Sequence, residues 1–119
     1  ALSEFTKLSK LTFGYLKLHY EDLPRITALK GLVELTFKQC RINYHWETVD
    51  FLLELRNLEK LNFISSVTPD YDGLKKLLME HTSLKILSLT HCPDISAETW
   101  SALSNVSRVR VEYCEEEPG

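Results

Sequence analysis

Apolar residues recur along this chain at one internal spacing, in five segments. Within each segment an apolar residue stands at the first position, three residues later and five residues later, and polar residues fill most positions between them. The five segments cover residues 8–13, 32–37, 58–63, 84–89 and 106–111. Their first positions lie 24, 26, 26 and 22 residues apart, which predicts five repeats in a single domain over residues 1–119.

The spacing inside each segment predicts a strand. Apolar residues two positions apart alternate with polar ones, as in a strand that buries one face, and the threonine, phenylalanine and valine residues suit strands as well. Parallel strands that follow one another need a crossover connection, usually a helix. We therefore expect short parallel strands near residues 9–14, 33–38, 59–64, 85–90 and 107–112.

The stretches between these strands carry helical patterns. The clearest begins at Thr68, a candidate cap, continues with Pro69, which suits a first helical turn, and ends near His81. Its leucines Leu74, Leu77 and Leu78 form one apolar stripe. Comparable helices are expected at residues 46–55 and 96–104, and only a turn or two at 23–29.

One column of the repeat collects every cysteine of the chain. Eight residues after the five first positions stand Leu16, Cys40, Ser66, Cys92 and Cys114. This column lies where the chain leaves the strand and turns inward. A small buried side chain with weak hydrogen-bonding capacity fits there, so the cysteines have a structural explanation.

The pattern L-x-x-L-x-L-x-x-C resembles the cysteine-containing class of leucine-rich repeats over residues 5–114. The fourth repeat, LKILSLTHCPDIS from Leu84 to Ser96, is similar to those of F-box leucine-rich-repeat substrate receptors of ubiquitin ligases. The resemblance implies an α/β leucine-rich-repeat solenoid, a right-handed β-α superhelix. Its short parallel sheet would line the concave face and its helices the convex face.

The same resemblance implies a protein–protein interaction module. It would be the substrate-recognition or scaffold part of a larger intracellular assembly such as a ubiquitin ligase. Side chains alternate across a strand, so the polar positions between the buried ones must face the concave surface. Tyrosine and arginine are common anchors in interfaces. The expected partner-binding residues are Tyr15, Ile64, Ile86, His91, Arg108, Arg110 and Tyr113.

Composition narrows the class of partner. The net charge of −3 does not favour direct contact with nucleic acid, and no apolar stretch is long enough for a membrane span. Three cysteines favour free thiols in the cytoplasm or nucleus. An RNA-associated adaptor and an immune-receptor fragment share the repeat and remain alternatives. The apolar residues near the N-terminus favour a piece of a longer array or an end that a partner covers.

Catalytic, metal-binding and cofactor-binding groups are not expected. His91 and Cys92 are neighbours, but the repeat turns His91 outward and Cys92 into the core, so they form a poor ligand pair. Stacking of Cys92 on Cys114 seldom gives the dihedral angle of a disulfide. His45 and His81 are expected as solvated residues at helix edges. No glycine-rich phosphate loop is present.

Overall fold

The computed structural model describes residues 9–15, 17–18, 25–42, 50–66, 68, 71–92, 96–106 and 108–114. The fold is α/β, and a five-stranded parallel sheet is its main element. The strands are β1 (Lys10–Gly14), β2 (Lys17–Leu18), β3 (Glu34–Lys38), β4 (Arg41–Ile42), β5 (Lys60–Ile64), β6 (Ile86–Thr90) and β7 (Arg110–Cys114). The helices are α1 (Asp50–Leu53), α2 (Tyr71–Glu80) and α3 (Ala97–Ser104).

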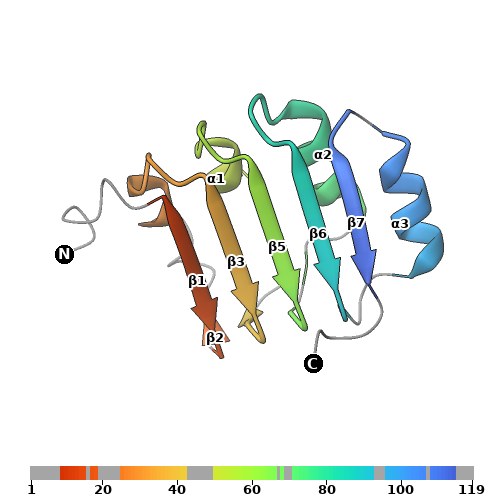
Figure 1. Ribbon diagram of the computed structural model, residues 1–119, viewed down its shortest axis with the longest axis horizontal. Coiled ribbons are helices and arrows are strands. Elements are labelled where there is room, and N and C mark those ends of the chain that lie inside the picture. The colour runs from red at the N-terminus through yellow and green to blue at the C-terminus, as the bar shows by residue number, and fades with distance from the viewer. Residues whose placement is uncertain are drawn as a thin grey trace.

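The large sheet follows the order of the chain, β1-β3-β5-β6-β7, and every neighbouring pair is parallel (Figure 1). Paired residues lie 24, 26, 26 and 24 positions apart, for example Lys10 with Glu34 and Glu34 with Lys60. The first four strands begin within one residue of their predicted starts. A second sheet of β2 and β4 is parallel too.

Two rows of apolar side chains run across the inner face of this sheet. In the first row Leu35, Leu61 and Leu87 pair in register and are fully buried. In the second row the rings of Phe13 and Phe37 stack at 5.7 Å, those of Phe37 and Phe63 stack at 5.3 Å, and Leu89 continues the row. The prediction that each strand buries its apolar face is therefore confirmed for these strands, and these side chains form the centre of the hydrophobic core.

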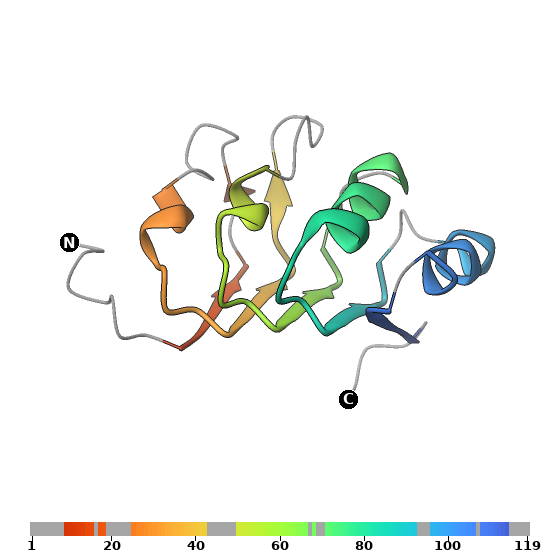
Figure 2. The same ribbon diagram turned by 90° about the horizontal axis from the view of Figure 1, so that it is seen from above.

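The helices pack over the inner face and leave the other face of the sheet uncovered in the described part of the chain (Figure 2). Helix α2 buries Leu74, Leu77 and Leu78, the stripe that the sequence predicts. Helix α3 begins after Ser96, whose side chain accepts a hydrogen bond from the backbone N–H of Thr99, as a helix cap does. A single 3₁₀ turn occupies residues 25–28.

Two helix predictions differ from the structure in extent. Helix α1 covers only Asp50–Leu53 of the predicted residues 46–55, and positions 46–49 lie outside the described residues. Helix α2 begins at Tyr71, and Pro69 also lies outside the described residues. The expected cap Thr68 is buried, and its hydroxyl has no hydrogen-bond partner among the described residues.

The fifth strand is displaced from its predicted position. It covers Arg110–Cys114, whereas the repeat pattern predicts residues 107–112. Val106 does follow α3 as the pattern requires, because its backbone N–H bonds to the carbonyl of Leu103 just as that of Leu58 bonds to the carbonyl of Leu55. Two extra residues then precede the strand, so Val111 and Tyr113 face inward at the positions expected for Val109 and Val111.

Candidate interaction surface

The side of the large sheet that no described helix covers is called here the open face. Strand alternation places on it the residues between the buried apolar positions. They form three rows in register. The rows are Lys10-Glu34-Lys60-Ile86-Arg110, Thr12-Thr36-Asn62-Ser88-Glu112 and Gly14-Lys38-Ile64-Thr90-Cys114.

Three of the seven predicted partner-binding residues lie on the open face. Arg110 is exposed, and Ile64 and Ile86 are half-buried. The two isoleucines occupy opposite ends of neighbouring strands, because Ile64 pairs with Thr90 while Ile86 pairs with Lys60. They therefore lie in different rows and do not form one apolar patch.

Tyr15 and His91 lie just beyond the carboxyl ends of β1 and β6, at the rim of the open face. Both are exposed, Tyr15 to 69%. Both have left-handed backbone angles, with φ of 59° and 48°, and Gln39 and Ser65 repeat this conformation at 51° and 49°. The N–H of Tyr15 bonds to the carbonyl of Lys38, and the other three residues make the same contact to the next strand. This periodic turn directs each chain segment away from the sheet.

Tyr113 does not lie on the open face, which contradicts the sequence prediction. It pairs in register with Leu89 on the inner face, is half-buried, and stacks on the indole ring of Trp100 at 5.7 Å. The Nε1–H of Trp100 donates to the carbonyl of Val111. The two extra residues before β7 are the reason, because they move Tyr113 from an outward to an inward position.

Arg108 also lies elsewhere than predicted. It precedes β7 at the amino-terminal rim of the sheet, where its guanidinium donates to the carbonyl of Thr82 at 3.1 Å. Arg110 pairs in register with Ile86. Arg108, two residues before Arg110, therefore takes the place that Leu84 takes two residues before Ile86. The last segment thus has an exposed arginine where the preceding one has a buried leucine.

A polar pair in the middle row was not anticipated from the sequence. The Nδ2 atom of Asn62 donates to the hydroxyl of Thr36 at 2.9 Å across the two strands. Both side chains are nearly buried by their neighbours, Asn62 to 9% exposure. The available signal was their common position in two repeats, which makes them direct cross-strand neighbours.

The described charges of the open face are mostly positive. Lys10, Lys38, Lys60 and Arg110 outnumber Glu34 and Glu112. Glu34 lies between the lysines of the two neighbouring strands, and Glu112 pairs with Arg110 at 3.3 Å. Exposed pairs of this kind contribute at most about 1 kcal/mol to stability, so their effect falls on partner choice more than on folding.

The cysteine column is confirmed at Cys40 and Cys92. Their thiols donate to the carbonyls of Phe13 and Phe63 in the preceding segment, and the hydroxyl of Ser66 donates to the carbonyl of Phe37 in the same way. The prediction is wrong for Cys114, which is exposed and pairs with Thr90 instead of stacking on Cys92. Leu16 lies outside the described residues.

His81 is not the solvated residue that was expected. It is 5% exposed, and its Nδ1 atom accepts from the backbone N–H groups of Ser83 and Leu84 at 3.2 and 3.0 Å. The proton of the neutral ring therefore lies on Nε2, which donates to the carbonyl of Leu52 at 3.1 Å. Burial lowers the pKa of His81, although hydrogen bonds to the backbone of Leu52 and Leu55 oppose that shift. His45 lies outside the described residues.

Within the described segments, histidine, cysteine and carboxylate side chains form no group of three that suits a metal ion. The described helices include none with the length and apolar character of a membrane span. The chain matches no protein-family model, and no curated protein is significantly similar to it in sequence. The arrangement of side chains is therefore the basis on which a function can be argued.

Proposed function

We propose that this chain is a leucine-rich-repeat solenoid whose sheet lines the concave side and whose helices form the convex side. Three observations support the proposal: the parallel register at intervals of 24 to 26 residues, the continuous inner rows of leucine and phenylalanine, and the helices on one side of the sheet. Each segment buries its apolar side chains against the next, so no segment is stable alone.

The function we propose is protein–protein interaction through the open face. The observation that carries it is a sheet surface of mixed lysine, glutamate, hydroxyl and isoleucine side chains that no described helix covers. A rigid strand scaffold positions such side chains at fixed spacings, which favours recognition of a complementary surface. This function is binding and not catalysis. The resemblance of the repeat at residues 84–96 to those of ubiquitin-ligase substrate receptors favours a substrate-recognition or scaffold role in a larger assembly of the cytoplasm or nucleus.

A matched pair of double variants tests this proposal. The open-face variant combines Lys38→Glu and Ile64→Glu, and the helix-side control combines Lys75→Glu with Met79→Glu on exposed positions of α2. Both variants change the same amount of charge, and circular dichroism with thermal unfolding verifies the fold of each. Proteins captured from lysate by the wild-type chain are quantified by mass spectrometry.

The expected result is loss of the stoichiometric partner from the open-face variant and its retention by the helix-side control. Equal capture by the wild type and the open-face variant would place the interaction on another surface. Loss only in the helix-side control would place it on the helices, and either result contradicts the proposal.

A further inference from the structure

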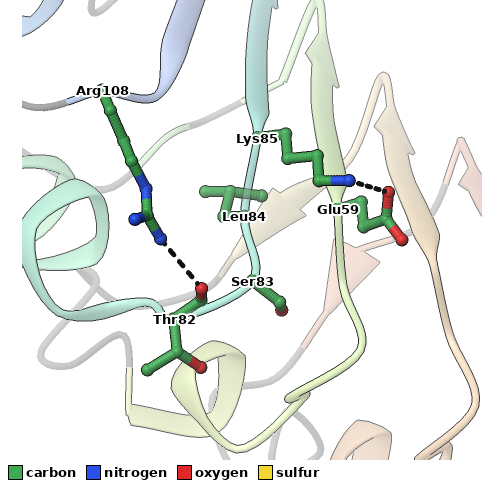
Figure 3. A pocket seen from close by; sticks show the side chains of 6 residues that line it. All are labelled: Glu59, Thr82, Ser83, Leu84, Lys85 and Arg108. Atoms are coloured by element: carbon green, nitrogen blue, oxygen red, sulfur yellow. Dashed lines mark hydrogen bonds and ion pairs between the residues drawn. The ribbon is translucent and has the colours of Figure 1, made fainter.

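A hollow of about 490 Å³ lies at the amino-terminal rim of the sheet (Figure 3). Residues of three consecutive segments line it: Glu59, Thr82, Ser83, Leu84, Lys85 and Arg108. Figure 3 shows the guanidinium of Arg108 on one side of Leu84 and the pair formed by Lys85 and Glu59 on the other. The hollow therefore has charged walls, and the buried Leu84 lies between them.

The two cations in these walls differ in how they are balanced. The ammonium of Lys85 lies 3.1 Å from a carboxylate oxygen of Glu59, so its charge has a partner. Among the described residues Arg108 has no carboxylate partner, and one of its N–H groups bonds to the neutral carbonyl of Thr82. A guanidinium carries five N–H donors in a planar fork, so this contact holds the group in place and leaves most donors for a ligand.

A side chain that bonds to a backbone carbonyl of the preceding segment at this rim does not need to be charged. At the corresponding joints of the earlier segments, the amide of Asn57 donates to the carbonyl of Lys30 and the hydroxyl of Ser83 donates to the carbonyl of Leu58, both at 2.8 Å. Neutral side chains thus make the same kind of contact between segments. The positive charge of Arg108 is not explained by the joint, and a charged residue at this position is a departure from the repeat.

We infer that this hollow binds a carboxylate of an acidic peptide segment, with Arg108 as its charged anchor. A planar guanidinium matches the two oxygens of a carboxylate, and bidentate contacts of this kind are stronger than neutral hydrogen bonds. Arg110 follows Arg108 by two residues and pairs in register with Ile86, which follows Lys85, so the open face adjoins the hollow. In taking a protein partner as the source of the carboxylate, the inference rests on the proposed function.

The test is a titration followed by two-dimensional ¹H–¹⁵N NMR. The probe is an N-acetylated, C-amidated triglutamate peptide, and a triglutamine peptide is its neutral control. Triglutamate is expected to shift the signals of Thr82, Ser83, Lys85 and the Arg108 side chain, whereas triglutamine leaves them in place. Substitution of Arg108 by Gln weakens this binding on the order of tenfold or more, while Arg56→Gln, in a separate hollow, leaves it unchanged.

Other outcomes overturn the inference. If triglutamate leaves the rim signals in place, or if the Arg108→Gln protein binds it as well as the wild type, the hollow is not a carboxylate site. Inorganic phosphate at the same ionic strength is a competing probe, and shifts from phosphate alone also refute the inference. The signals of residues far from the rim show whether each variant keeps its fold.

The inference and the proposed function fail in different experiments. Loss of capture by the open-face variant together with absent triglutamate shifts overturns the rim site alone. Triglutamate binding that depends on Arg108, together with unchanged capture by the open-face variant, overturns the proposed open-face function alone.

Discussion

The central segments and the last segment of the sheet have different residues at the amino-terminal rim and in the inner row. In the centre, Leu58 and Leu84 close the amino-terminal rim, and Phe37 and Phe63 stack inside. In the last segment two extra residues follow Val106, so the position two residues before the strand is the exposed Arg108. The inner row continues there with Tyr113, which stacks on the indole ring of Trp100 in α3. The apolar rows thus continue unchanged from β1 to β6, and polar and charged contacts enter at β7, where two extra residues shift the pattern.

The largest expected effect is a loss of stability in the inner row of Leu35, Leu61 and Leu87, and it should be larger at the centre of that row than at β7. Leu61 is fully buried between Leu35 and Leu87, so Leu61→Ala leaves a cavity and lowers the free energy of unfolding by about 2–5 kcal/mol. Val111 has only Leu87 as a described register partner, and Val111→Ala is expected to lower it by less than about 2 kcal/mol. Urea denaturation measures both, and equal losses would contradict the comparison.

A pH effect is expected at the joint before the last two strands. The pKa of His81 is lowered in the folded chain, so below its ordinary value of 6.5 the unfolded chain binds the additional proton more readily. The stabilisation is therefore complete above this pH and decreases as the pH falls toward the lowered pKa. Protonation of Nδ1 also opposes the two backbone N–H groups that donate to it.

Urea denaturation at about pH 7.5 and about pH 5.5 measures this effect. The control is His81→Gln, whose amide keeps one donor and one acceptor but does not titrate. The wild type is expected to lose more stability between the two pH values than the control. An equal loss in both proteins would show that His81 does not contribute to the pH dependence.

Sequence reasoning succeeded where side-chain periodicity has only one solution. A shift of one residue would turn every inward-facing leucine and phenylalanine of β1, β3, β5 and β6 to the other face, so the pattern determines their register. The prediction failed at β7, because two registers satisfy the alternation equally well. One turns Val109 and Val111 inward, and the other turns Val111 and Tyr113 inward. Only the two extra residues after α3, visible in the structure, decide between the two registers.

Side-chain environments were less predictable than register. Burial of a histidine after a helix depends on partners such as the carbonyl of Leu52, which lies 29 positions earlier in the chain. Sequence likewise showed that Thr36 and Asn62 share a column, but not that their side chains bond to each other. The positions of Tyr113 and Arg108 were misjudged for the same reason as β7.

A smaller difference in stability is expected between substitutions of the buried Cys92 and of the exposed Cys114. Cys92→Ala removes the donor to the carbonyls of Phe63 and Thr90 and is expected to lower stability by about 1–3 kcal/mol. Cys92→Ser is expected to cost less than about 1 kcal/mol, because Ser66 makes the equivalent contact. Cys114→Ala, at an exposed position, stays within about 0.5 kcal/mol. Thermal unfolding ranks the three variants, and a large loss for Cys114→Ala would contradict this ranking.

The smallest expected effect is a gain in stability. Ser65 has a left-handed backbone, and its buried hydroxyl has no hydrogen-bond partner in the described part of the chain. Glycine adopts this backbone without steric cost, although its greater entropy when unfolded offsets part of the gain. Ser65→Gly is therefore expected to stabilise the chain by roughly 0.5 kcal/mol, more than His91→Gly does at an exposed left-handed position. Urea denaturation measures the stability of both variants. A lower stability of Ser65→Gly than of His91→Gly would contradict this prediction.

The most direct measurement of the repeated register is a nuclear Overhauser spectrum of the aromatic and methyl protons in solution. It is expected to connect the ring of Phe63 with that of Phe37 on one side and with the methyl groups of Leu89 on the other, since these residues pair in register. It should also connect the rings of Tyr113 and Trp100. A spectrum in which the rings of Phe37 and Phe63 share no cross-peak would contradict the stacked rows on which the proposed fold and function depend.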